Sequence, residues 1–114
     1  MLGKNKIILK KVISEINLEF EMLDNVSLEN FLEDEKTKRA VAMTAINIGE
    51  LVKGLTSEFR IENNQVEWKK IAGLSDIISN KYYTVDMEEV YNAVKNEFSE
   101  LKAQIEKILE SEEL

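Results

Sequence analysis

The feature that most constrains the fold of this chain is the scarcity of residues that interrupt helices. Its 114 residues include no proline and only four glycines. Because these two residues most often mark turns, the chain favours long helices and disfavours an all-β fold. We expect one domain spanning residues 1–114, with 44% hydrophobic residues supplying a modest core. A chain this small often gains stability by forming oligomers.

Apolar side chains recur at spacings of three and four along much of the chain, which is the pattern of amphipathic helices. This pattern predicts four long helices, over residues 5–23, 34–56, 66–82 and 86–111. Ser27 is suited to cap a short helix over 28–33, and a turn of helix is expected over 58–61. The sequence therefore predicts an all-α bundle of four or five helices.

Three residues carry more specific expectations about packing. Gly49 lies inside the second long helix, where glycine costs about 1 kcal/mol relative to alanine. We expect it to permit close approach of another helix, in the core or at a dimer seam. Trp68 is expected to anchor the core. In the first helix the charged residues, Glu19 among them, are expected to lie mostly off the apolar stripe.

The absence of histidine and cysteine restricts the chemistry available to the chain. Without histidine, no side chain has an unperturbed pKa near neutrality. Any acid–base step would need a carboxylate, lysine or tyrosine with a strongly shifted pKa. Without cysteine, the chain has no disulfide, thiolate nucleophile or cysteine metal ligand. The formal net charge of −7 repels phosphate backbones, so RNA binding is disfavoured unless basic residues gather on one face.

No sequence pattern indicates a metal, a cofactor or a membrane segment. The densest carboxylate cluster, Glu33–Glu35, consists of consecutive residues that cannot all face one ion from a helix. Calcium-loop and glycine-rich phosphate-loop patterns are missing. No apolar run is long enough to span a membrane, and the start of the chain lacks a signal-peptide core. We therefore expect a cytoplasmic protein with no metal, no cofactor and no membrane partner.

The stretch from Ile71 to Asp86 resembles a motif of the HepT-like proteins, a family of the HEPN superfamily of small all-α domains. The family motif reads Ala-Gly, a spacer, Arg with Asp or Asn, a few apolar residues, His, one residue, Tyr and then Val-Asp. Six residues of this chain fall on that pattern without a gap: Ala72, Gly73, Asp76, Tyr82, Val85 and Asp86. Ser75 stands at the position of the catalytic Arg, and Asn80 at that of the His.

The likeness extends over most of the chain. Further matching segments are Phe31–Asp34, Ile48–Glu50 and Trp68–Gly73. The resemblance implies an all-α homodimer in which Arg and His from both protomers meet in an interfacial cleft and cleave RNA without metal. It also implies a small nucleotidyltransferase partner that attaches AMP to the motif tyrosine and silences the toxin. Tyr82 falls on that tyrosine.

The predicted site has a conserved outline and an altered chemistry. Its members are the former catalytic positions Ser75 and Asn80, the modification or partner-contact residue Tyr82, and three neighbours: Asp76, Lys81 and Glu50. Ser75, Ser79 and Tyr82 are expected on one helix face, because they follow one another at spacings of four and three. Neither Ser75 nor Asn80 is a base at neutral pH or carries charge. We therefore predict no catalytic residue of the family type in this chain.

Three functional hypotheses remain open. The first is a catalytically degenerate HepT-like protein that binds or regulates a minimal nucleotidyltransferase in a toxin–antitoxin-type module. The second is a ribonuclease toxin with an altered site, in which Lys81 supplies charge and Tyr82 or Asp76 moves protons. The third is a helical assembly protein with no nucleotide connection. Plainer roles compete with each site residue: Lys81 and Glu50 as solvated side chains, Asp76 as a local hydrogen-bond acceptor and Tyr82 as a packing residue.

Overall fold

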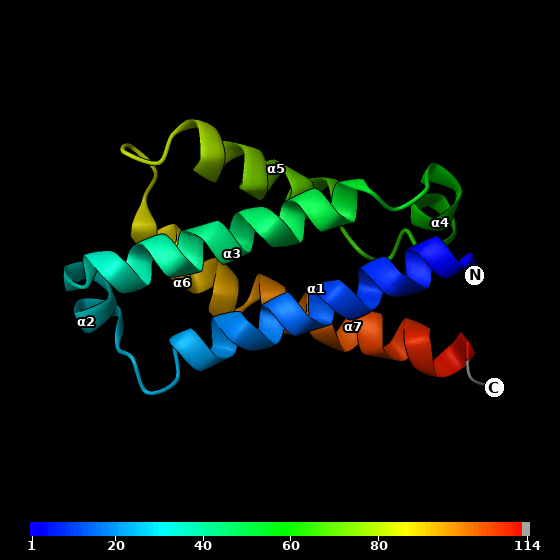
Figure 1. The fold of residues 1–114 in the computed structure, drawn as a ribbon, viewed down its shortest axis with the longest axis horizontal. Coiled ribbons are helices and arrows are strands. Elements are labelled where there is room, and N and C mark those ends of the chain that lie inside the picture. The colour runs from blue at the N-terminus through cyan, green and yellow to red at the C-terminus, as the bar shows by residue number, and fades with distance from the viewer. Residues whose placement is uncertain (113–114) are drawn as a thin grey trace.

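The computed structural model describes residues 1–112, and within that range every regular element is a helix. The longer helices are α1 (Gly3–Met22), α3 (Glu35–Lys53), α5 (Trp68–Asn80), α6 (Met87–Lys95) and α7 (Glu97–Glu112). The helices α2 (Leu28–Glu33) and α4 (Ser57–Glu62) have six residues each. In Figure 1, α1 and α3 run antiparallel, α5 packs along α3 on the side away from α1, and α6 and α7 cover the bundle from behind. The all-α bundle predicted from the sequence is confirmed.

Side chains cap the N-termini of α2, α3, α4 and α6. The Ser27 hydroxyl accepts a hydrogen bond from Asn30 N, as predicted, and Asp34 accepts one from Thr37 N at the start of α3. This bond, together with the Thr37 hydroxyl, lowers the pKa of Asp34. Asp86 caps α6 by accepting from Glu88 N. Each cap satisfies a helix N–H that would otherwise have no partner.

Two predicted helices differ from the structure: one is divided in two and the other ends earlier. The last helix is interrupted at Asn96, whose φ of −109° and ψ of −68° separate α6 from α7. The apolar spacing continues across this break, so periodicity could not reveal it. The third long helix ends at Asn80, because Lys81 leaves helical geometry with φ −134° and ψ 35°. Tyr82 therefore follows the helix and does not lie on it, contrary to the prediction.

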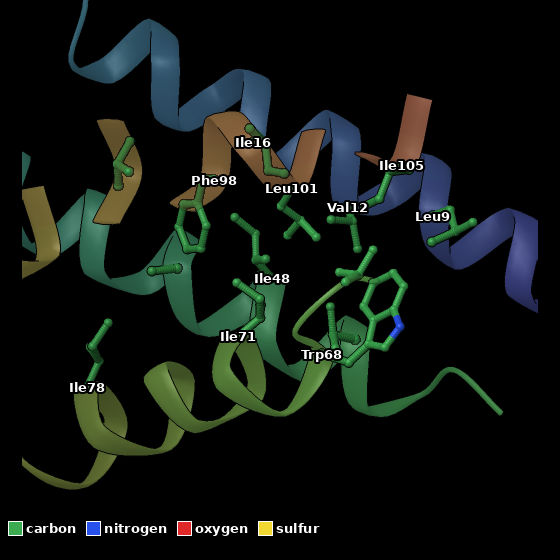
Figure 2. Close-up of a cluster of buried hydrophobic side chains, with 14 of the residues drawn as sticks. Leu9, Val12, Ile16, Ile48, Trp68, Ile71, Ile78, Phe98, Leu101 and Ile105 are labelled. Carbon is green, nitrogen blue, oxygen red and sulfur yellow. The ribbon is translucent and has the colours of Figure 1, made fainter. Parts of the chain in front are cut away.

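The core forms where α1, α3, α5 and α7 converge. Figure 2 shows Leu9, Val12 and Ile16 of α1 facing Ile48 of α3 and the side chains of Leu101 and Ile105 from α7. Trp68 is only 5% exposed, and its indole N–H donates to the Asn63 carbonyl oxygen at 3.1 Å. Its ring also packs against Phe59 with centroids 5.8 Å apart. The predicted role of Trp68 as a core anchor is confirmed. No helix within residues 1–112 has both the length and the apolar character needed to cross a membrane.

Two helices of the bundle, α3 and α5, approach each other closely at Gly49. A Cβ atom at this position would lie 2.1 Å from the Ser75 Cβ and 3.2 Å from the Ile71 carbonyl oxygen. The first distance is shorter than any tolerated contact, so only glycine fits while α3 and α5 keep this spacing. The expectation that Gly49 permits close packing in the core is confirmed, and the contact belongs to the seam between α3 and α5.

We predict that Gly49→Leu destabilises the fold, because its side chain must push α5 away from α3. The expected loss in free energy of unfolding is about 1–3 kcal/mol, the usual range for overpacking. The measurement is urea denaturation followed by circular dichroism. Gly73→Ala is the matched control: a Cβ at Gly73 meets nothing within 4 Å, so alanine should be neutral or stabilising. A Gly49→Leu protein that melts higher than the native protein would contradict the close contact.

Glu19 is buried on the apolar face of α1, so the prediction that it lies off this face is wrong. Its side chain is 0% exposed, and neither carboxyl oxygen has a hydrogen-bond partner among the described residues. Glu19 follows the buried Val12 and Ile16 and precedes the buried Leu23 at spacings of three and four, which places it on the stripe. Burial, with a smaller contribution from Glu15, raises the pKa of Glu19 to about 9. The carboxyl group is therefore neutral in the folded protein at pH 7.

We predict that this buried group makes the protein less stable as pH rises. A folded pKa of about 9 against an ordinary value of 4.5 means that the folded state binds the extra proton. The contribution of Glu19 to stability is therefore fully present below about pH 4.5 and is lost between pH 4.5 and 9, by at most ~1.4 kcal/mol per pH unit. Glu19→Gln should flatten this slope in urea denaturation at pH 5 and 8. The exposed Glu21→Gln is the control, and an unchanged slope in Glu19→Gln would contradict the assignment.

Candidate functional site

Ser75 is buried in the seam between α3 and α5. Its side chain is 0% exposed because the Gly49 contact brings the two helices together at this point. The hydroxyl oxygen lies 3.1 Å from the Ile46 carbonyl oxygen and 3.3 Å from Glu50 Oε1. Since a hydroxyl has one proton, it donates to one of these acceptors at a time. Ser75 is therefore a packed, hydrogen-bonded residue at the edge of a polar cluster.

Lys53 completes this cluster, and sequence analysis did not single it out. Its ammonium group lies 2.9 Å from Glu50 Oε1 and 2.5 Å from Asp76 Oδ1. The hydrogen bond to Asp76, followed by the one to Glu50, raises the pKa of Lys53. The amine is therefore protonated at neutral pH. One cation between two carboxylates leaves the cluster with a formal charge of −1. The spacing from Glu50 to Lys53, three residues on one helix, was the sequence signal for this ion pair.

Asn80 and Lys81 lie at the C-terminal end of α5, where both are exposed. Asn80 is the last residue of α5, and Lys81 begins the turn that leads to α6. The Lys81 carbonyl oxygen accepts hydrogen bonds from Thr84 N and Val85 N, which fixes the turn. Within residues 1–112 the Lys81 ammonium group forms no ion pair, so its charge faces solvent. The side chains of both residues are accessible to a partner or ligand.

Tyr82 lines a groove between α3 and the end of α5. The groove has a volume of about 270 Å³ and is bounded by Arg39, Ala42, Met43, Ile46, Ile78, Ser79 and Tyr82. The phenol O–H donates to Glu35 Oε1 at 3.5 Å, and the Arg39 guanidinium carbon lies 5.2 Å from the ring centroid. Partial burial, followed by the nearby Glu35 carboxylate, raises the pKa of Tyr82. The side chain is therefore a neutral phenol at neutral pH.

The structure divides the predicted site into separate groups. Ser75, Glu50 and Asp76 gather around Lys53, whereas Tyr82 belongs to the groove beside Arg39. The predicted common face of Ser75, Ser79 and Tyr82 is only partly correct. Ser79 and Tyr82 line one groove, whereas Ser75 turns into the α3–α5 seam, where it packs on Gly49. Arg39 and Glu35 lie 43 and 47 residues before Tyr82 in the chain, so no local pattern could pair them with it.

The chemistry of these groups favours binding over proton transfer. A general base needs a free lone pair near neutrality. The neutral phenol of Tyr82 and the protonated amine of Lys53 do not provide one, and Glu50 and Asp76 are held by Lys53. Among residues 1–112, no three His, Cys, Asp or Glu side chains gather in a way that could hold a metal ion. The exposed hydroxyl, amide and ammonium groups remain as hydrogen-bonding contacts.

Comparison with known proteins relates the chain to ribonuclease-like proteins. A family described as "Ribonuclease HepT-like" matches residues 11–108. A protein of Caldanaerobacter subterraneus subsp. tengcongensis named "Putative RNase TTE0752" is 33% identical over 91% of this chain and 93% of its own length. "Probable ribonuclease HepT" of Thermococcus cleftensis is 29% identical over 95% of this chain and 98% of its own length. No solved structure matches the chain significantly.

Proposed function

Because the chain belongs to the HepT-like ribonuclease family, we propose that it is a member without the family's catalysis that acts as a binding or regulatory protein. The observation that carries this proposal is the identity of two residues. The resemblance places a catalytic Arg and His at the positions held here by Ser75 and Asn80. The chain contains no histidine at any other position that could replace the lost imidazole.

The chemistry of RNA cleavage explains why these two positions matter. Without metal, a base must take the proton of the 2′-hydroxyl, and a cation must stabilise charge on the phosphoryl oxygens. Asn80 cannot accept that proton, and Ser75 is a buried neutral hydroxyl. Lys53, which shares the Glu50 carboxylate with Ser75, is already neutralised by Glu50 and Asp76. This environment supports the proposal that the former active site binds without cleaving.

A ribonuclease with an altered residue set is the second candidate. The relatives' names support it, since "Probable ribonuclease HepT" and "Putative RNase TTE0752" both cover most of this chain. Lys81 would supply the charge, because its ammonium group is exposed beside the former histidine position. Tyr82 would have to release its proton, and its raised pKa opposes that step. The degenerate site is therefore the better-supported proposal.

We further propose that the outer face of α3 and α5 binds a second copy of this chain. Met43 of α3 is 58% exposed and lines the groove beside Tyr82, and Ile77 of α5 is 51% exposed, while α1 packs against α3 on another side. Exposed apolar side chains of this size favour a protein partner over water. A second copy would cover Met43 together with the groove beside Tyr82, and it would bring the two Asn80 positions to one interface.

The proposed partner beyond the homodimer is a small nucleotidyltransferase of a toxin–antitoxin-type module in the cytoplasm. Tyr82 supports this proposal because it matches the family's modified tyrosine and its phenol oxygen borders an accessible groove. With no ribonuclease activity to silence, the tyrosine would serve as a contact residue. Tyr83 beside it is 92% exposed and extends the same aromatic surface, with ring centroids 5.9 Å apart.

We predict that the purified native protein does not cleave RNA over several hours, with or without EDTA. The reason is that no described group near the former site is an unpaired base at neutral pH. The assay follows a fluorescently labelled single-stranded RNA on a denaturing gel. Cleavage that survives EDTA and is lost in Lys81→Ala or Tyr82→Phe would contradict this proposal and favour the altered ribonuclease. Lys107→Ala, in α7, is the control for loss of a lysine.

For the dimer, we predict that sedimentation equilibrium gives a mass of two chains for the native protein. Met43→Glu or Ile77→Glu should shift the protein toward monomer, because each places a charge in the proposed interface. Leu18→Glu is the matched control, since Leu18 is 44% exposed on α1, away from this face. A native monomer, or a dimer unchanged by both interface substitutions, would refute the assignment of this surface.

A further inference from the structure

An open pocket lies at the N-terminal end of α5, whereas Ser75 lies in the middle of this helix and Asn80 at its C-terminal end. It is formed where α4 meets the start of α5, at the end of the bundle where α1 begins (Figure 1). Its volume is about 820 Å³, within the range of small-molecule sites. Neither hypothesis for the former active site makes use of this cavity, and we call it the α4–α5 pocket.

The α4–α5 pocket is positively charged in an otherwise acidic chain. Its lining includes the cations Arg60, Lys69 and Lys70 and the single carboxylate Glu67. Lys70 is shared between Glu67 at 3.6 Å and Glu97 at 3.8 Å. Arg60 and Lys69 form no ion pair within residues 1–112. Two uncompensated cations at one cavity, in a chain of formal net charge −7, indicate a site for an anion.

Arg60 carries the most specific signal in the pocket. Its Nε atom is buried and has no hydrogen-bond acceptor among the described residues. A buried donor without an acceptor is costly, and native proteins usually satisfy such groups. The guanidinium group offers a planar set of donors that matches the oxygens of phosphate or carboxylate. Because Nε itself is buried, an anion in the pocket would accept from the terminal nitrogens of the same guanidinium group, which are not among the buried atoms.

The uncharged part of the lining contains the polar residues Ser57 and Asn64 and an apolar group that includes an aromatic residue. Val66 and Trp68 border the pocket, and Ile61, which also lines it, is 71% exposed. An exposed isoleucine next to two free cations suits a ligand that has both an apolar part and an anionic part. A flat heterocycle could pack on this wall while its phosphate reaches Arg60 and Lys69.

We propose that the α4–α5 pocket binds a small phosphorylated ligand of mononucleotide size, with its phosphate on Arg60 and Lys69. A single mononucleotide fits better than a long RNA, because a polyanion would also meet the negative charge of the remaining surface. This site lies apart from the former catalytic positions and does not depend on the proposed function. It assigns binding only, with no bond formed or broken.

The test uses Trp68, the only tryptophan, as a fluorescent reporter in the native full-length chain. UMP and AMP are titrated in parallel, with uridine and inorganic phosphate as partial ligands. We expect a saturable change in Trp68 emission with a mononucleotide and a weaker response to phosphate alone. Arg60→Gln and Lys69→Gln should each raise Kd roughly tenfold, the effect of losing one charge-assisted hydrogen bond.

Two comparisons keep the result interpretable. Lys10→Gln removes one exposed lysine from α1, away from the pocket, and should leave Kd unchanged. Circular dichroism confirms that each variant is folded, and the exposed Lys69 provides a second test if Arg60→Gln is unstable. The proposal is overturned if neither mononucleotide gives saturable binding, if uridine binds as tightly as UMP, or if folded Arg60→Gln and Lys69→Gln both keep the native Kd.

Discussion

The contact between Gly49 and Ser75 determines how α3 and α5 lie against each other. Gly49 adds no side chain to this contact, and a Cβ atom at position 49 would lie only 2.1 Å from the Ser75 Cβ. This spacing buries Ser75, brings its hydroxyl to the Ile46 carbonyl and places Glu50, Lys53 and Asp76 within ion-pairing distance across the seam. The position that holds an arginine in the family motif is thus part of the helix packing here.

Much of the fold could be predicted from residue spacing and caps. Ser27 caps α2 as expected, and the apolar stripes give the long helices within a few residues. The break at Asn96 was missed because its neighbours keep the same apolar spacing on both sides. Glu19 was misplaced for a related reason: a charged residue suggests solvent, although its position follows the buried stripe. The spacing of apolar residues predicts which face of a helix is buried. It does not predict a local break in the helix or the protonation state of a buried acid.

The candidate site shows where residue patterns lose their information. The motif predicted the positions of Ser75, Asn80 and Tyr82 along the chain. The residues that surround Ser75 and Tyr82 belong to α3, about 25 residues or more earlier in the chain. Lys53, Arg39 and Glu35 therefore entered the account only through tertiary packing. The electrostatics follow from the same packing. Two carboxylates raise the pKa of Lys53 and burial raises that of Tyr82, so both shifts oppose the loss of a proton from these groups, which supports a binding role for this surface.

The central claim is that two residues, and not the fold, separate this chain from cleavage of RNA. Ser75 is buried in the seam and its hydroxyl contacts Glu50, so an arginine at position 75 would have to extend past Glu50 to reach solvent. The most direct measurement compares RNA cleavage by the native chain with cleavage by folded Ser75→Arg/Asn80→His, both in EDTA. The account predicts cleavage by the double variant and none by the native chain. Equal cleavage by both proteins would contradict it, because catalysis would then be independent of the residues at these positions.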